Sequence, residues 1–196
     1  PLPNRLQVLG DYPLCHPALI NYLDIRAVDT TIAKKFCREV HYSVGGRNYF
    51  AIGFRNDYGG WELRSERFKG CSTPKYITTI DNGSDKALAF EGFMDFLSYL
   101  TIKQNDSTTC NIAVLNSVAN VQKAVPFLAR HRSIYTFLDN DDAGRKALAE
   151  IERLCPQSKV INQSDFYRRH KDLNDYLRSQ QPRKRVVAKQ KRGFKM

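Results

Sequence analysis

The sequence has no run of 18 or more apolar residues, and it does not open with the pattern of a secretory signal. We therefore expect no membrane span, and we place the protein in the cytoplasm. Its five cysteines are scattered and include no Cys-x-x-Cys pair. This spacing argues against a zinc site and a disulfide framework, and it is typical of buried thiols in a reducing compartment.

Acidic residues are absent from residues 181–196, where seven Lys and Arg residues gather. Removing these seven charges from the formal net charge of +11 leaves +4, so the rest of the chain is only mildly basic. We expect a flexible basic tail over 181–196 that binds a polyanion, most often a nucleic acid. A solvated terminus without a partner explains the same composition equally well.

The first part of the 196-residue chain mixes helical and extended patterns. Apolar residues recur at helical spacing over residues 17–38, and residues 49–64 read as a β-hairpin with a Gly-rich turn. Residues 1–13 have no periodic pattern, so we expect them to be irregular. These patterns predict a small α+β subdomain over residues 1–85, and we place its boundary in the polar loop 81–85.

The second part of the chain repeats a strand-then-helix rhythm. Strands are expected at 86–91, 111–115, 133–139 and 159–161, and helices near 93–101, 119–130 and 143–154. Strands that alternate with helices predict an α/β domain, over residues 86–180, with a parallel sheet flanked by helices on both faces.

Two of the expected strands end in acidic residues. Glu91 ends the first strand, and Asp139 and Asp141 follow the third. Because the carboxyl ends of parallel strands share one edge of the sheet, we expect these three side chains to meet there. Asp95 lies one helical turn beyond Glu91, and Asp172 lies in the loop after the last strand. Both are expected at the same edge.

Clustered carboxylates repel one another, so such a site needs a cation. Hard oxygen ligands select Mg²⁺ or Mn²⁺ over zinc, and these ions act on the phosphates of nucleotides and nucleic acids. A structural explanation competes, because an Asp-x-Asp before a helix also serves as its N-cap. Asp141 or Asp142 could have only that role. A receiver-like acidic pocket is a third interpretation, but it needs a lysine where Asn162 and Gln163 stand.

Three motifs stand at the ends of the expected strands or in the loops beyond them. They are Phe90-Glu91-Gly92-Phe93-Met94-Asp95, residues 137–147, and Lys171-Asp172-Leu173-Asn174-Asp175. In content and order they resemble the Toprim domain, the metal-binding fold shared by topoisomerases, bacterial-type primases and some nucleases. The resemblance implies that Glu91 acts in acid–base chemistry or metal binding, and that Asp139 and Asp141 hold Mg²⁺. Asp95 and Asp172 match acids that line the metal site of primases.

One position departs from the primase pattern. Primases have a second acid two residues after Asp172, and Asn174 stands there in this chain. Asp175 is the acid that could replace it. The departure puts one metal position in question.

The first part of the chain carries a second resemblance. Its residues are Tyr49-Phe50-Ala51-Ile52, the Gly-Gly turn and Ser72-Thr73-Pro74-Lys75-Tyr76, and they are similar to the small subdomain that precedes Toprim in bacterial-type primases. By position, Lys75 and Arg64 would face the template or nucleotide, with Arg67 and Lys69 as further candidates. The Gly-Gly-Arg of primases is replaced by Trp61-Glu62-Leu63-Arg64. A solvated loop lysine and a charge at the hairpin edge explain Lys75 and Arg64 equally well.

The resemblance implies a DNA primase-type nucleotidyltransferase, from a mobile element or plasmid, that makes RNA primers with Mg²⁺ or Mn²⁺. Its expected partners are a single-stranded DNA template, ribonucleoside triphosphates and a replicative helicase. A zinc-binding module, if the protein has one, would precede Pro1. Two other classes stay open: a Toprim nuclease that hydrolyses phosphodiesters with the same acids, and a non-catalytic nucleic-acid-binding module.

Overall fold

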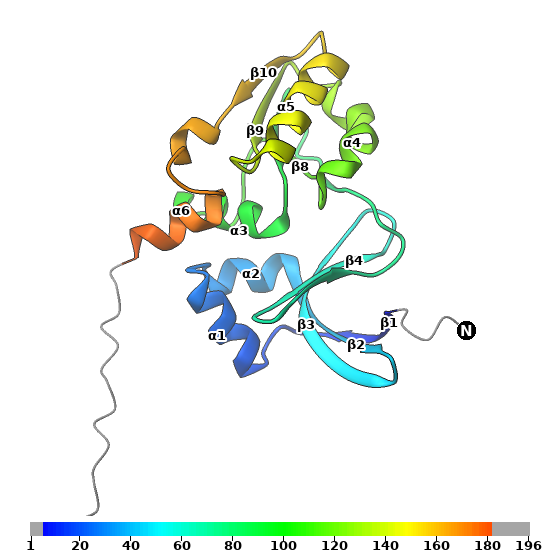
Figure 1. Ribbon diagram of the computed structural model, residues 1–196. Coiled ribbons are helices and arrows are strands. Elements are labelled where there is room, and N and C mark those ends of the chain that lie inside the picture. The colour runs from blue at the N-terminus through cyan, green and yellow to red at the C-terminus, as the bar shows by residue number, and fades with distance from the viewer. Residues whose placement is uncertain (1–5, 182–196) are drawn as a thin grey trace, which may run out of the picture.

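The computed structural model describes residues 6–181, so the expected basic tail lies outside the described residues apart from Gln181. The described part of the chain forms two units, each built on one five-stranded sheet (Figure 1). Within it, no helix is both long enough and apolar enough to span a membrane. All five cysteines are unpaired, but only Cys37 and Cys155 are buried, so the expectation of buried thiols is wrong for the other three.

The first unit is an antiparallel sheet in the order β1-β2-β3-β4-β5, with two helices. Its strands are β1 (Gln7–Tyr12), β2 (Cys37–Val44), β3 (Arg47–Arg55), β4 (Trp61–Ser65) and β5 (Phe68–Cys71), and its helices are α1 (Pro17–Ile25) and α2 (Thr30–Phe36). Strands β3 and β4 pair with Ile52 opposite Arg64, which confirms the hairpin expected over 49–64.

Strand β1 shows that the expectation of an irregular stretch is wrong for Gln7–Tyr12. The strand lies at the edge of the sheet and pairs with β2 through its backbone, across an irregularity between Val8 and Gly10. Leu9 and Tyr12 are both half exposed. An edge strand held by backbone pairing needs no strict alternation of buried side chains, which explains why its sequence shows no period.

The second unit confirms the expected α/β sheet flanked by helices. Its strand order is β10-β9-β7-β8-β6, and β6 alone runs antiparallel to its neighbour. The strands are β6 (Thr78–Ile80), β7 (Lys86–Phe90), β8 (Asn111–Val114), β9 (Ser133–Phe137) and β10 (Lys159–Asn162). The helices are α3 (Phe93–Lys103), α4 (Val121–Leu128), α5 (Asp142–Leu154) and α6 (Leu173–Gln180), with 3₁₀ turns at Val118–Asn120 and Ser164–Tyr167. The sequence pattern missed β6, which belongs to this sheet although it precedes the loop 81–85; the division at that loop stays a prediction.

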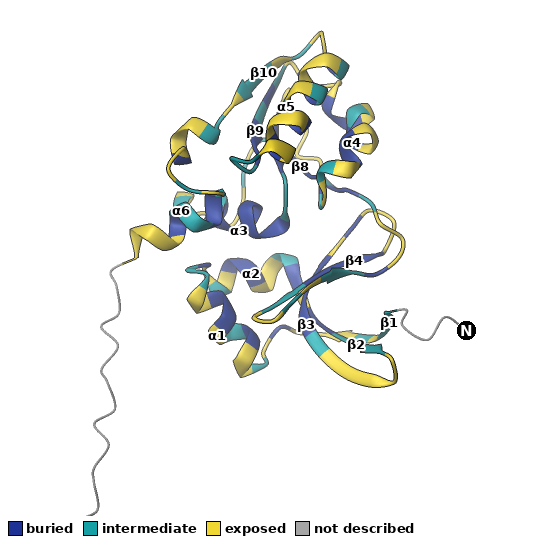
Figure 2. Ribbon diagram, viewed as in Figure 1, coloured by how far each residue is buried: buried dark blue, intermediate teal, exposed yellow. Residues whose placement is uncertain are grey.

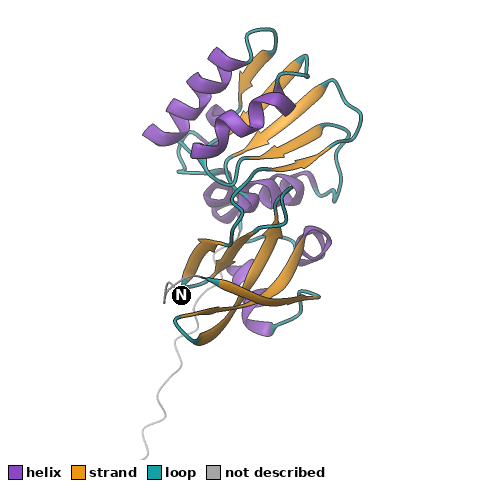
Figure 3. Cartoon of the chain, turned by 90° about the vertical axis from the view of Figure 1, so that its right-hand side faces the viewer, coloured by secondary structure: helices purple, strands orange, loops and turns teal. Residues whose placement is uncertain are grey.

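Successive residues of the central strands face opposite layers of helices. Leu88 and Phe90 of β7 belong to a core that includes α3 and α6, whereas Ala87 and Ala89 face the core of α4 and α5. Figure 3 shows the second sheet between these helices, with the first sheet below it. The sheet therefore has a buried face on each side, as a parallel sheet requires.

Helix α3 packs against both units. Figure 2 shows it buried between the second sheet and the elements of the first unit, and its residues are buried around almost the whole helix. The Phe93 ring stacks on Phe54 of β3 at 5.3 Å between centroids, and Phe96 meets Phe36 of α2 edge-on at 5.0 Å. One continuous hydrophobic core thus fixes the first unit against the acidic end of β7.

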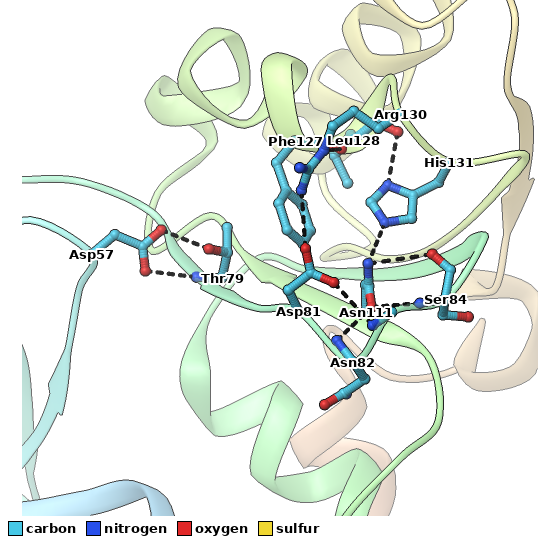
Figure 4. A network of polar contacts seen from close by, with 11 residues as sticks. Asp57, Thr79, Asp81, Asn82, Ser84, Asn111, Phe127, Leu128, Arg130 and His131 are labelled. Atoms are coloured by element: carbon cyan, nitrogen blue, oxygen red, sulfur yellow. Dashed lines mark hydrogen bonds and ion pairs between the residues drawn. The ribbon is translucent and has the colours of Figure 1, made fainter.

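The loop 81–85, which joins β6 to β7, is anchored at the opposite end of the sheet by a polar network (Figure 4). The Oδ1 atom of Asn111 accepts hydrogen bonds from the backbone N–H groups of Asn82, at 2.7 Å, and Ser84, at 3.1 Å. The Nδ2 atom of Asn111 lies 2.7 Å from Nε2 of His131, and both of these side chains are buried. One buried amide therefore ties the loop to β8 and to the end of α4.

Replacing Asn111 by Ala should lower the free energy of unfolding by roughly 1–3 kcal/mol, because two N–H groups lose their acceptor and His131 loses its partner. Urea unfolding followed by circular dichroism measures the change. The matched control is Asn21→Ala on the exposed side of α1, expected within about 0.5 kcal/mol of the parent chain. Equal stability of the two variants would contradict the anchoring role.

Candidate active site

The ends of β7 and β9 bring two of the expected acids into contact. The two strands are parallel neighbours, with Phe90 beside Phe137. Immediately beyond them, the N–H group of Asp139 donates a hydrogen bond to Oε2 of Glu91 at 3.2 Å. Residues 48 positions apart in sequence thus meet at one edge of the sheet, as the topology predicts.

Asp95 and Asp172 complete an acidic wall around a cavity of about 230 Å³. Asp95 lies in the first turn of α3, is almost fully buried, and accepts a hydrogen bond from the N–H group of Asn174 at 3.2 Å. Asp172 is the N-cap of α6 and accepts from the N–H group of Asp175 at 2.7 Å. Four of the five expected acids therefore line one cavity.

Burial and mutual repulsion act on these carboxyl groups together. Burial, followed by the charge of Asp139, raises the pKa of Glu91 to about 7. Burial and the charge of Asp172 also raise the pKa of Asp95 well above its ordinary value. The pKa of Asp139 is raised by the same two causes, while the Lys171 ammonium opposes the shift. Burial and like charge thus disfavour the ionised form of these carboxyl groups.

Asp141 stands at the margin of this site and has the structural role that the sequence left open. Its Oδ1 atom caps α5 by accepting from the N–H groups of Ala143 and Gly144, each at 3.0 Å. A Cβ atom at Gly144 would lie 2.1 Å from the carbonyl oxygen of Asp139, so only glycine lets α5 start this close to the strand end. The other oxygen of Asp141 lies 3.9 Å from the Lys171 ammonium, which lies 3.5 Å from Asp139.

The opposite wall of the cavity is basic and comes largely from the first unit. Arg64 of β4 and Lys69 of β5 line it, as does Arg26 at the end of α1. The Arg64 guanidinium lies over the Phe93 ring at 5.8 Å from the ring centre. The Nε atom of Arg26 is buried and has no hydrogen-bond partner among the described residues. Positive groups from one unit therefore face the carboxylates of the other.

Sequence reasoning missed two charged residues of this cavity, Arg26 and Lys171. Lys171 belongs to a motif that was recognised for its acids, and its place directly before Asp172 was the available signal. Nothing in the sequence around Arg26 signals the cavity, because α1 reaches it only through the packing of the two units.

Two other expected residues lie outside the cavity. The side chain of Lys75 does not line it, and the carbonyl oxygen of Lys75 accepts a hydrogen bond from Lys123 at 2.8 Å. Arg67 lies in the turn between β4 and β5 and lines a separate groove. Roles for both residues stay predictions.

Asn174, which replaces an expected acid, joins three elements behind the cavity. Its side chain is fully buried, and Nδ2 donates to Oγ of Ser98 at 2.8 Å and to the carbonyl oxygen of Arg26 at 2.9 Å. These bonds connect α6 with α3 and with the end of α1. Asp175, the expected substitute, instead pairs with Arg178 at 3.2 Å and does not line the cavity.

The chemistry of the donor set fits a hard divalent cation. All five acids offer oxygen atoms, and their mutual repulsion is the kind that Mg²⁺ or Mn²⁺ relieves. Within residues 6–181, no group of three or more His, Cys, Asp or Glu side chains is already arranged to hold a metal ion. The fit therefore rests on the charge and type of the ligands.

Comparison with known families identifies the second unit. Residues 88–177 match the family described as Toprim-like. This part of the chain resembles a Toprim-like domain. Residues 8–73 match a family described as a domain of unknown function (DUF8464). No curated protein matches the chain in sequence.

Solved structures show the two units together in one known fold. The primase fragment of the bacteriophage T7 primase-helicase protein has a TM-score of 0.57 and 19% identity, over 85% of this chain and 74% of that one. A structure of the bacteriophage T7 lagging-strand DNA polymerase interacting with primase domains has a TM-score of 0.52 and 20% identity. The match covers 71% of this chain and 76% of that one. The Aquifex aeolicus primase has a TM-score of 0.51 and 16% identity, over 77% of this chain and 50% of that one. At these identities the likeness shows a primase-like fold.

The raised pKa of Glu91 predicts a pH-dependent stability in the absence of divalent ions. The neutral carboxyl favours the folded state, so its contribution is fully present below about pH 4.5 and is lost as the pH rises to about 7. Glu91→Gln keeps an oxygen that accepts from Asp139 but does not titrate. Its stability relative to the parent chain should therefore grow between these pH values and level off above them.

Denaturant unfolding in EDTA across this pH range measures the difference. If the difference in free energy of unfolding between Glu91→Gln and the parent chain stays constant from pH 4.5 to 7, the raised pKa of Glu91 is contradicted.

Proposed function

We propose that this chain is the catalytic part of a DNA primase-type nucleotidyltransferase, which joins ribonucleotides on a single-stranded DNA template with Mg²⁺ or Mn²⁺. The observation that carries the proposal is one cavity lined both by carboxylates and by the basic side chains of Arg26, Arg64 and Lys69. Phosphoryl transfer needs both: acids that hold a divalent ion, and cations that hold the phosphates.

In this proposal Asp139 and Asp141 would hold the ion, with Asp95 and Asp172 behind them, which leaves Glu91 free to act as the base. A bound divalent ion supplies neutralisation of the phosphate charge. Arg64 and Lys69 bind the triphosphate and orient its α-phosphate toward the primer end. Glu91 accepts the proton of the attacking hydroxyl as the new O–P bond forms and pyrophosphate leaves, a role that suits a buried carboxyl.

Synthesis is favoured over the nuclease alternative by the basic wall and by the solved relatives. A nuclease needs the acids but no binding site for a nucleoside triphosphate. One similar structure contains primase domains bound to an RNA/DNA hybrid and dTTP, and another is part of a primase-helicase protein. These names support a template, a nucleotide substrate and a helicase partner for this chain.

The experiment is incorporation of labelled ribonucleotides on single-stranded DNA with Mg²⁺ or Mn²⁺. Asp139→Asn/Asp141→Asn should reduce template-dependent product at least about a hundredfold, because the ion loses two charged ligands. Asn at position 141 keeps the helix cap, so the fold should persist. The matched control is Asp142→Asn, whose side chain is 86% exposed and points to Arg145; it should retain activity.

Template degradation that the double variant abolishes would assign the nuclease instead. If the chain binds Mg²⁺ but neither makes product nor degrades the template, it is a nucleic-acid-binding module.

The cavity also predicts different effects for two basic residues. Arg64→Gln should raise the KM for the nucleoside triphosphate by about tenfold, because Arg64 lines the cavity where its charge is partly desolvated. Lys75→Gln should change the KM less, because its side chain does not line the cavity. Steady-state kinetics on a fixed template compares the two, and a larger effect at Lys75 would move the triphosphate site away from the acids.

A further inference from the structure

A second hollow lies next to the acidic cavity and is not used by the proposed chemistry. It is a groove of about 560 Å³ between α1, the projecting β2–β3 hairpin and the turn that joins β4 to β5. Its lining is largely apolar and rich in aromatic rings: Tyr42, Tyr49, Phe50 and Phe68. We refer to it below as the aromatic groove.

Three of these rings form a stack with one open end. Tyr42 is buried between Tyr49 and Phe68. Its ring centre lies 5.7 Å from that of Tyr49 and 5.1 Å from that of Phe68, and in both pairs the ring planes are inclined by 27°. Tyr49 is 44% exposed. A planar aromatic group can therefore continue the stack from the groove side of Tyr49.

The groove also runs along an open strand edge. Strand β4 pairs with β3 only from Ile52 onward, so residues 47–51 of β3 pair with β2 alone among the described residues. The space beside them is therefore open to an extended ligand.

Charge and position connect the aromatic groove with the acidic cavity. Strands β4 and β5 present Arg64 and Lys69 to the cavity, and the turn between them presents Arg67 to the groove. Glu66 is the one acid that lines the groove. A polyanion lying along this hairpin would meet positive charge in both hollows and aromatic rings in one.

We propose that the aromatic groove binds bases of the single-stranded nucleic acid whose backbone passes along the β4–β5 hairpin to the acidic cavity. This proposal rests on the proposed function, since it takes the strand to be the template. Stacking on Tyr49 tolerates any base, so the groove holds the template without reading its sequence. The rival occupant is a second copy of this chain, paired with the open edge of β3. Arg64, Arg67 and Lys69 outnumber the two acids of this hairpin, Glu62 and Glu66, and this small excess of positive charge favours the nucleic acid.

The test measures the affinity of the full chain for a fluorescein-labelled oligothymidine by anisotropy, in EDTA so that no chemistry occurs. Tyr49→Leu keeps apolar bulk but removes the ring, and it should weaken binding roughly five- to tenfold. Tyr49→Trp should restore or exceed the parent affinity, which a purely structural role would not explain. The control is Tyr12→Leu on β1, which is 50% exposed and lies outside the groove.

Charge is tested separately. Arg67→Gln should reduce the slope of log affinity against log salt by about one, as expected for one lost phosphate contact.

Parent-like affinity of Tyr49→Leu, or an equal loss in Tyr12→Leu, would overturn the proposal. So would a concentration-dependent dimer, seen by sedimentation, that Tyr49→Leu abolishes without changing DNA affinity. Binding is measured without a divalent ion, so the two proposals are tested independently. A negative binding result would not contradict primer synthesis, and a negative synthesis result would not change the affinity measured here.

Discussion

Repulsion among buried carboxylates at one edge of a parallel sheet is the constraint on which this structure depends. Glu91 and Asp139 meet because β7 and β9 are adjacent, and Asp95 joins them from the first turn of α3. The charged form of this cluster is unfavourable to folding, because burial and like charge both oppose ionisation. The chain maintains a locally unfavourable cluster, as proteins do where a site must bind a cation.

The two units are held together by apolar contacts and face each other with opposite charge. The stacking of Phe54 on Phe93 and the hydrogen bond from Asn174 to the carbonyl oxygen of Arg26 fix their relative position. The same arrangement places Arg64 opposite the acids. Neither unit contains a complete site, so the packing of α3 between them determines the chemistry that the cavity can support.

The sequence predicted the four parallel strands of the second unit, because each has apolar residues and acids mark the ends of β7 and β9, but it missed the short, polar β6. It predicted the first unit less well. Edge strand β1 relies on backbone pairing, which leaves no period to read. Arg26 could not be predicted, because only tertiary packing brings it to the acids. Asp141 has the cap role in one oxygen, its other oxygen lies 3.9 Å from the Lys171 ammonium, and its role as a metal ligand stays a prediction.

The most direct test of this account is the unfolding temperature as a function of Mg²⁺ concentration, at constant ionic strength set with NaCl. If the clustered acids form a cation site, Mg²⁺ should raise the unfolding temperature of the parent chain by several degrees, through binding to the folded state alone. Asp139→Asn should lose most of that rise. An equal response of both chains, or no response beyond that to NaCl, would contradict the claim that these carboxylates form a cation site.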